Sequence, residues 1–200
     1  MKETEIVKRY NALKSDRSDV EEVWRLQERF IRPLTGKFYS DNLEYDSKPD
    51  WRRRDIYDGT APLAAQTLAA SIQGNLMSSS YRWFDFNYQN DELNKKKDTR
   101  EWLETATEKV FYALAQSNFD EEANESLLDL VGYGNGVMVE EWNPKTNEID
   151  FVCVPVREAY FELDSSKNVY HFYRKLEWTA VQCVEKFGED NVPKCIKDAY

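Results

Sequence analysis

The sequence predicts an α+β fold in which helices pack on a small antiparallel sheet. In several segments before about residue 133, apolar residues recur at intervals of three and four, which is typical of amphipathic helices. From Val137 onward the period changes to two, as in β-strands. Hydrophobic residues make up 41% of the 200 residues, enough for a substantial core, while 32% are charged, as expected of a large wet surface.

The segment DIYDGTAPLAAQTLAASIQGNLMSSSYRWF, residues 55–84, is the most apolar part of the chain, and we expect the rest to be arranged around it. Thr60 is predicted to cap a helix there, with Pro62 in the first turn. The predicted apolar stripe consists of Ala61, Ala65, Leu68, Ile72 and Leu76. Because Ala69 and its neighbours on the other faces are also small, we predict a helix enclosed on several sides.

The alternation from Trp83 to Tyr88 predicts a strand after this helix, with Trp83 and Phe84 as an aromatic pair next to it. Residues 34–51 have neither period and are predicted to be a long loop. Before them, one helix is predicted over 3–14, and a second begins at a capping box of Ser18 and Glu21 and ends at Pro33.

Two further helices are predicted between residues 98 and 133. Asp98 is expected to cap the first of them. Its inward residues are predicted to be Leu103, Ala106, Val110, Ala113 and Leu114. Asn118 and Glu121 have capping-box spacing for the second helix, which leads into VGYGNG. There Gly132, Gly134 and Gly136 allow a helix to end and turn tightly into a strand.

The period-two segments VMVEEW, IDFVCVPV, AYFEL and VYHFYRKL predict one antiparallel meander of three or four strands. Thr179 is then expected to cap the helix AVQCVEKF, which Gly188 would end. Pro193 is expected to open a last helix that is still running at Tyr200.

No residue pattern indicates catalysis, a cofactor or a metal. His171 is the sole histidine, and it lies in a strand pattern with no nucleophile assigned beside it. Cys153, Cys183 and Cys195 lack the paired spacing of zinc ligands or of a disulfide framework, so reduced thiols are expected. The VGYGNG glycines follow a helix rather than a strand, which is the reverse of a phosphate-binding loop.

The formal net charge is −10, and residues 101–200 hold the excess of negative charge. Tight binding to duplex DNA needs positive charge, so the composition argues against it. The basic run of Arg52, Arg53 and Arg54 is a candidate phosphate contact, with a solvated patch or ion pairs to Asp50 and Asp55 as the alternative. The longest apolar helix, Ala61 to Met77, is too short and too polar to span a membrane, and no secretory signal is recognised, so a cytoplasmic chain is expected.

Four segments follow one another in the order SDRSDVEEVWRLQERFIRP, DGTAPLAAQTLAASIQGNLMSSSYRWFDF, SNFDEEANESLLDLVGYGNGVMVEEW and VPVREAYFELDSSKNVYHFYRKLEWTA. In this order they resemble the portal proteins, or head-to-tail connectors, of short-tailed double-stranded-DNA bacteriophages. The resemblance covers nearly the whole chain. It implies a non-enzymatic structural protein, present in the virion and assembled in the host cytoplasm.

The resemblance also implies a homo-oligomeric, dodecameric ring at one capsid vertex. Such a ring contacts capsid protein, terminase and tail proteins, and double-stranded DNA passes through it during packaging and ejection. Residues 1–200 would be the amino-terminal, wing-like region of a longer protein, with carboxy-terminal parts missing. The alternative is a non-enzymatic α+β adaptor or binding module in a multi-protein assembly without a DNA channel.

Overall fold

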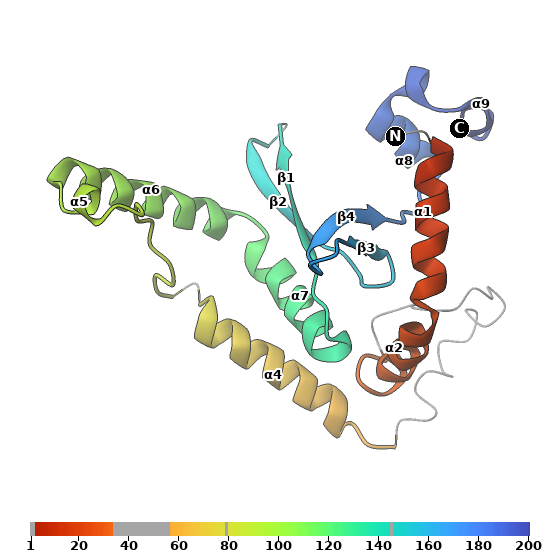
Figure 1. Ribbon diagram of the computed structural model, residues 1–200, viewed down its shortest axis with the longest axis horizontal. Coiled ribbons are helices and arrows are strands. Elements are labelled where there is room, and N and C mark those ends of the chain that lie inside the picture. The colour runs from red at the N-terminus through yellow and green to blue at the C-terminus, as the bar shows by residue number, and fades with distance from the viewer. Residues whose placement is uncertain (1–2, 34–56, 79, 145) are drawn as a thin grey trace. The chain divides into compact units, whose positions relative to one another are not determined.

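The computed structural model describes residues 3–33, 57–78, 80–144 and 146–200. In these residues the fold is α+β, as predicted, with helices and two-stranded antiparallel sheets (Figure 1). The chain forms two compact units, Met1–Arg157 and Glu158–Tyr200.

The described elements of the first unit are α1 (Glu3–Asp16), α2 (Ser18–Phe30), α4 (Thr60–Leu76), α5 (Asp91–Asn94), α6 (Lys97–Gln116), α7 (Phe119–Tyr133), β1 (Met138–Asn143) and β2 (Glu148–Cys153). The capping box predicted for the second helix is wrong, because Ser18 is already helical and Arg17 occupies the N-cap position. Arg17 instead forms an ion pair of 2.7 Å with Glu21 one turn later.

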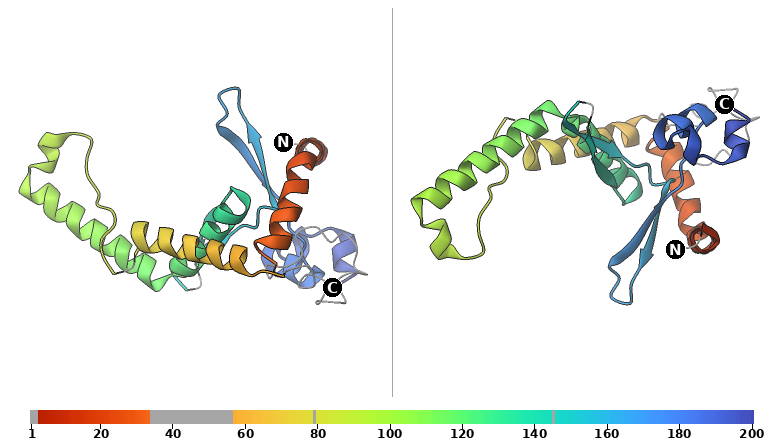
Figure 2. Two further views of the ribbon diagram at one scale, coloured as in Figure 1. Left: turned by 90° about the horizontal axis from the view of Figure 1, so that it is seen from below. Right: turned by 90° about the horizontal axis from the view of Figure 1, so that it is seen from above.

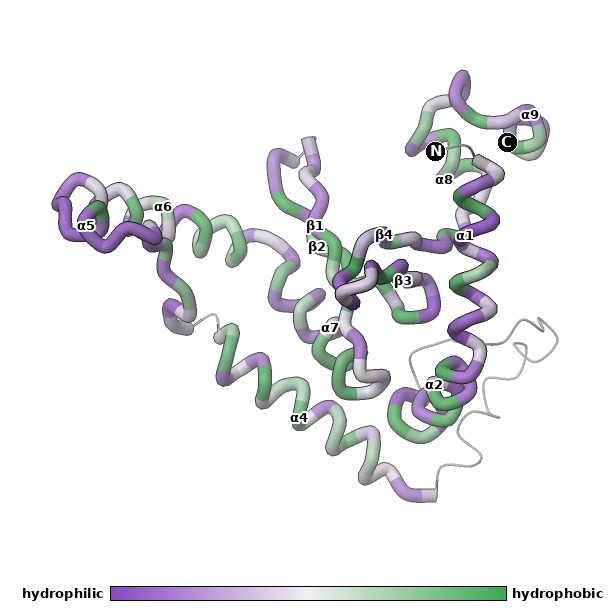
Figure 3. The backbone as a smooth tube through the Cα atoms, in the orientation of Figure 1, coloured by the Kyte–Doolittle hydropathy of each residue, from purple (hydrophilic) through white to green (hydrophobic). Residues whose placement is uncertain are grey.

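Helix α4 packs along one face on α7, as Figures 1 and 2 show. Ala65 and Ala69 are buried in this contact, whereas Leu68 is 50% exposed. The prediction of a helix enclosed on several sides is therefore wrong, since the described neighbour covers one side of it. The sequence signal was misleading because α4 carries no charged residue at all, and its tube is largely green or pale in Figure 3.

The start of α4 also differs from the prediction. Thr60 does not cap the helix but is its first residue, and its backbone N–H and its hydroxyl donate to Asp58 Oδ1, at 2.9 and 2.6 Å. These two bonds, the hydroxyl bond first, lower the pKa of the Asp58 carboxyl. The cap is thus supplied two residues earlier than expected.

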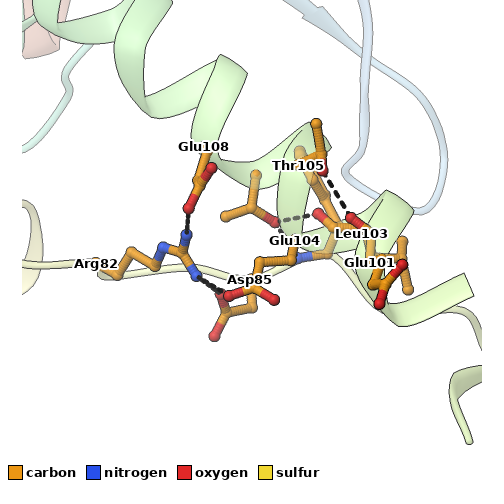
Figure 4. Close-up of polar contacts among 9 residues, drawn as sticks. Arg82, Asp85, Glu101, Leu103, Glu104, Thr105 and Glu108 are labelled. Carbon is orange, nitrogen blue, oxygen red and sulfur yellow. Dashed lines mark hydrogen bonds and ion pairs between the residues drawn. The ribbon is translucent and has the colours of Figure 1, made fainter. Parts of the chain in front are cut away.

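Residues 83–88 do not form the predicted strand, because their backbone groups bind side chains of helices α5 and α6 rather than another strand. The Phe86 N–H donates to Thr107 Oγ1 at 3.3 Å, and the Tyr88 N–H donates to Asn94 Oδ1 at 2.9 Å. Figure 4 shows Arg82 at the start of this segment, donating to Glu108 on α6. Backbone groups of this alternating segment thus form hydrogen bonds with helix side chains. The period of two in the sequence could not reveal these partners.

Helix α6 begins one residue before Asp98, so Asp98 lies in its first turn and Lys96 is the N-cap residue. Among the predicted inward residues Leu103 is buried, but Val110 is exposed, and the fully buried position is Thr107. The Thr107 hydroxyl donates to the Leu103 carbonyl at 2.8 Å, so a polar residue fits in this position.

Among the described residues, buried side chains of the first unit form two clusters. Trp24, Tyr133 and Val156 form one, in which the Trp24 indole N–H donates to the Tyr133 carbonyl at 3.1 Å. Phe119, Ala123 and Phe151 form the other. Met77, Trp83, Leu114 and Ile149 pack around the second cluster. The first cluster joins α2 to α7, and the second joins α4, α6 and α7 to β2.

The second unit contains β3 (Ala159–Leu163), β4 (Val169–Arg174), α8 (Ala180–Phe187), the 3-10 turn η2 (Glu189–Asn191) and α9 (Lys194–Lys197). The capping box of Thr179 and Gln182 starts α8, and Gly188 ends it, which confirms both predicted boundaries. The last helix begins after Pro193 as predicted, but it ends at Lys197 rather than running to Tyr200.

The predicted single meander is wrong, because β1 pairs with β2 and β3 pairs with β4 in separate sheets. The segment between β2 and β3 breaks the ladder. Val154 and Val156 are 0% and 1% exposed, Pro155 between them has no N–H, and Arg17 donates to the Val156 and Arg157 carbonyls at 3.2 and 3.1 Å. These backbone groups are therefore taken up by α2 instead of by a third strand.

Candidate functional site

The described residues contain no group of three or more His, Cys, Asp and Glu side chains that could hold a metal ion. Within the same described ranges, no helix is long and apolar enough to cross a membrane. Arg52, Arg53 and Arg54, the candidate phosphate contact, lie outside the described residues. His171 Nδ1 lies 3.2 Å from Glu162 Oε2 on the paired strand of its own hairpin.

A cavity of about 230 Å³ lies where the end of α2, one face of α7 and the residues after β2 meet. Charged side chains dominate its lining. The lining residues are Arg32, Glu122, Glu125, Asp129, Tyr133, Cys153, Pro155 and Arg157. We call Arg32, Glu125 and Asp129 the ion cluster.

Arg32 is the centre of the ion cluster, and its side chain is only 6% exposed. Nη1 donates to Asp129 Oδ1, and Nη2 donates to Glu125 Oε2 at 2.9 Å. Arginine suits this position because its planar guanidinium offers several donors at fixed angles to two carboxylates. The cluster fastens the chain just after α2 to the middle of α7.

Gly132 makes room for this arginine. A Cβ added to Gly132 would lie 3.1 Å from Arg32 Cδ, closer than side chains usually approach. Gly134 ends α7 in the left-handed region, with φ of 80°. A Cβ on Gly136 would lie 2.5 Å from the Ser126 carbonyl oxygen. In VGYGNG, Gly132 and Gly136 therefore allow close packing, and Gly134 allows the left-handed backbone at the end of α7.

Burial raises the pKa of Asp129 to about 6, because desolvation outweighs the opposing effect of the Arg32 guanidinium. The Glu125 carboxylate nearby also raises it. Near neutral pH the cluster is thus one guanidinium between two carboxylates. Burial makes the charged form of Asp129 less favourable than it would be in water.

Cys153 lines the same cavity, and burial raises the pKa of its thiol to about 12. The carboxylates of Asp129, Glu122 and Glu125 raise it further by disfavouring a thiolate. A thiol that stays protonated is a poor nucleophile and a poor metal ligand. Cys153 therefore does not supply this cavity with a reactive thiolate.

Two side chains at the start of α7, those of its N-cap residue Asn118 and of Glu122, bind the outer edge of strand β2. The Asn118 amide donates to the Phe151 carbonyl at 2.7 Å and accepts from the Phe151 N–H at 2.8 Å. One turn later, Glu122 Oε2 accepts from the Cys153 N–H at 2.5 Å. These bonds replace a neighbouring strand, and they explain why Asn118 does not form the predicted capping box.

The residues singled out in the sequence lie in the scaffold around this site. Ala65 and Ala69 are buried, Ile72, Trp83 and Phe84 are partly buried, and Leu68 is exposed. Trp83 stacks on Phe119 with ring centroids 6.2 Å apart, and Phe84 stacks on Phe111 at 4.4 Å. Sequence reasoning missed Arg32 and Asp129 and did not place Cys153 beside them, because nothing in their spacing marks a contact between residues so far apart in the chain.

Helix α7 is thus an acid-rich helix that binds Arg32 after α2 and the outer edge of strand β2. The model of the family described as bacteriophage head to tail connecting protein matches residues 3–200. The chain therefore belongs to this family of phage connector proteins. It is similar to the portal protein of Salmonella phage epsilon15, with 24% identity over 203 residues. That match covers 100% of this chain but 36% of the relative, so the chain spans about a third of its length.

Proposed function

We propose that this protein is a portal protein that forms a dodecameric ring at one vertex of a phage capsid. Viral DNA would be packaged through the ring by a separate terminase and ejected through it, and the tail would attach to it. The protein would be non-enzymatic, without a cofactor, and part of the virion after assembly in the host cytoplasm. Its partners would be capsid protein, terminase and tail proteins.

The observation that carries the proposal is the family match over residues 3–200, which covers all the segments on which the resemblance was based. The acidic character of the chain, with a net charge of −10, supports a channel along which DNA moves without adhering. The site supports a structural role, since its charged groups bind one another and its cysteine is held as a thiol.

The mass of the full-length gene product in solution tests the proposal. We expect a symmetric dodecamer by native mass spectrometry, because ring contacts join two different surfaces of each subunit and close on themselves. A monodisperse monomer at micromolar concentration would overturn the portal proposal. It would favour the alternative, a non-enzymatic α+β adaptor in an assembly without a DNA channel.

We also propose that residues 1–200 correspond to the amino-terminal, wing-like region of such a subunit. The assignment to one region of a longer subunit agrees with the phage epsilon15 relative, of which the match covers 36%. A fragment that holds only part of either ring surface loses contact area faster than it loses its own core. Sedimentation of residues 1–200 beside the full-length chain should show a ring for the full-length chain alone. A stable ring of fragments would contradict the assignment.

A further inference from the structure

The two edges of the β1–β2 hairpin differ, and the hydrogen-bond pattern shows how. The Val154 N–H donates to the Val137 carbonyl at 2.8 Å, so this pair is a bonded pair of the ladder. Bonded and non-bonded pairs alternate in antiparallel strands, and the register runs without a shift from Met138 and Cys153 to Asn143 and Glu148. The backbone groups of alternate residues in each strand therefore point away from the hairpin.

On strand β2 the outward groups belong to Ile149, Phe151 and Cys153. The side chains of Asn118 and Glu122 bind both Phe151 groups and the Cys153 N–H at 2.5 to 2.8 Å. The start of helix α7 thus protects this part of the edge as a neighbouring strand would. Natural proteins commonly protect sheet edges in such ways, because an open edge invites pairing with another chain.

On strand β1 the outward groups belong to Met138, Glu140 and Trp142. Within the described residues, the structure records no hydrogen bond from these three N–H groups to any partner. The edge is six residues long and has no bulge, proline or inward-pointing lysine. A two-stranded sheet is also below the size that is stable by itself. These three N–H groups are the donors that a third strand would bind on this edge.

The side chains along β1 indicate which kind of third strand would bind beside it. Glu140 and Glu141 are exposed on opposite faces, and Asp150 lies across from Glu141. Trp142 is 59% exposed and Met138 is 38% exposed, on the same face as Glu140. Opposite charges stabilise cross-strand pairs, and an aromatic ring adds contact with a cation.

A second copy of β1 fits this edge poorly. Glu140 and Glu141 of the second copy would lie close to Glu140 and Glu141 of the first. Like charges that face each other across a ladder are destabilising. A basic segment has no such conflict.

We propose that the β1 edge is a docking site for an extended, basic segment of a partner protein, which adds to the hairpin as a third strand. Backbone hydrogen bonds to Met138, Glu140 and Trp142 would give affinity. Lysine or arginine side chains facing Glu140 and Glu141 would select the partner. The inference goes beyond the ring proposed above and does not depend on it.

The test uses the 200-residue chain and a fluorescent hexapeptide with two central lysines, Thr-Val-Lys-Lys-Val-Thr, in an anisotropy titration. We expect saturable binding, at least tenfold weaker for the matched peptide with two glutamates in place of the lysines. A third peptide carries the lysines but is N-methylated at alternate amides. It should also bind at least tenfold more weakly, because it keeps the charge and loses the backbone donors.

Two variants at one position separate backbone pairing from charge. Glu140→Pro removes an outward N–H without removing a bond of the hairpin, whereas Glu140→Ala keeps the N–H and removes the carboxylate. We expect Glu140→Pro to abolish binding and Glu140→Ala to weaken it several-fold, with thermal midpoints close to the parent's.

The proposal would be overturned if the glutamate peptide, or the N-methylated peptide, bound as tightly as the lysine peptide. This comparison holds even if the proline variant fails to fold. Concentration-dependent dimerisation that Glu140→Pro removes would also overturn it, in favour of a second copy as the occupant.

Discussion

The ion cluster shows how single residues hold this structure together. Buried ion pairs often contribute little net stability, because removing two charges from water costs about as much as their attraction returns. Losing one partner is different, since the remaining charge stays buried without compensation. The cluster therefore fixes where α2 meets α7 more than it adds to the free energy of unfolding.

A pH prediction follows from Asp129, whose pKa is raised from 3.8 to about 6 in the folded chain. The folded state binds this proton more tightly than the unfolded state, so the residue's contribution to stability falls as pH rises from about 4 to about 6. A shift of this size corresponds to roughly 2–3 kcal/mol at about 1.4 kcal/mol per pKa unit. Asp129→Asn should remove this pH dependence.

The measurement is urea unfolding of parent and Asp129→Asn at several pH values between 4 and 7. Glu125→Gln, at a side chain that is 56% exposed, should keep this pH dependence in reduced form, because Glu125 is a lesser cause of the raised Asp129 pKa. If the difference between parent and Asp129→Asn does not change with pH, Asp129 is not the buried acid that the structure indicates.

Cysteine reactivity offers a second prediction at this scale. With a thiol pKa of about 12, Cys153 should react with iodoacetamide at pH 8 at least about a hundredfold more slowly than a small-molecule thiol. Cys195 is exposed and serves as the internal comparison. Variants that retain only Cys153 or only Cys195 can be followed by mass spectrometry. Equal rates in folded protein would contradict the burial of Cys153, whereas equal rates in urea are expected.

At the scale of elements, α4 is a helix that rests on α7 through small residues. Ala69 is 0% exposed, and Gln73 links the two helices through bonds to the Asp120 carbonyl at 2.8 Å and to Asn124 at 2.7 Å. The alanines set how closely the two backbones approach. A larger side chain has to push the helices apart.

Ala69→Leu should therefore lower the free energy of unfolding by about 1–3 kcal/mol, the usual cost of overpacking a tight contact. Ala70→Leu, one position along on the exposed side, should change it little. Thermal unfolding of both variants decides the matter. If Ala69→Leu melts like the parent, α4 does not pack on α7 as described.

Much of this secondary structure could be predicted from sequence, because apolar periods and the Thr179 and Gly188 signals are local. The sequence could not predict which hydrogen-bond partner each polar group has in the folded chain. Asn118 had the spacing of a cap but binds strand β2, and residues 83–88 alternate like a strand but bind α6. In the site, Arg32 meets Asp129 across 97 positions of sequence. Choices of this kind depend on the tertiary contacts, which a local pattern does not contain.

At the scale of the whole molecule, charge is the property most relevant to a connector. The described basic residues next to the site are engaged, with Arg32 on Glu125 and Asp129 and Arg17 on Glu21. A phosphate contact would have to compete with these carboxylates. The net charge of −10 adds a general repulsion from DNA.

We therefore expect the 200-residue chain to bind duplex DNA weakly and with a steep dependence on salt, because such binding rests on phosphate neutralisation. Labelled duplex titrated at roughly 50 and 200 mM salt measures this, since several phosphate contacts would change affinity by orders of magnitude over that range. Replacing Arg52, Arg53 and Arg54 together by Gln tests the basic run and should remove most of the residual binding. Replacing Lys95, Lys96 and Lys97 by Gln is the matched control, with the same change of charge elsewhere in the chain. Submicromolar affinity that survives the higher salt would contradict a channel along which DNA slides, and would favour a dedicated DNA-binding module.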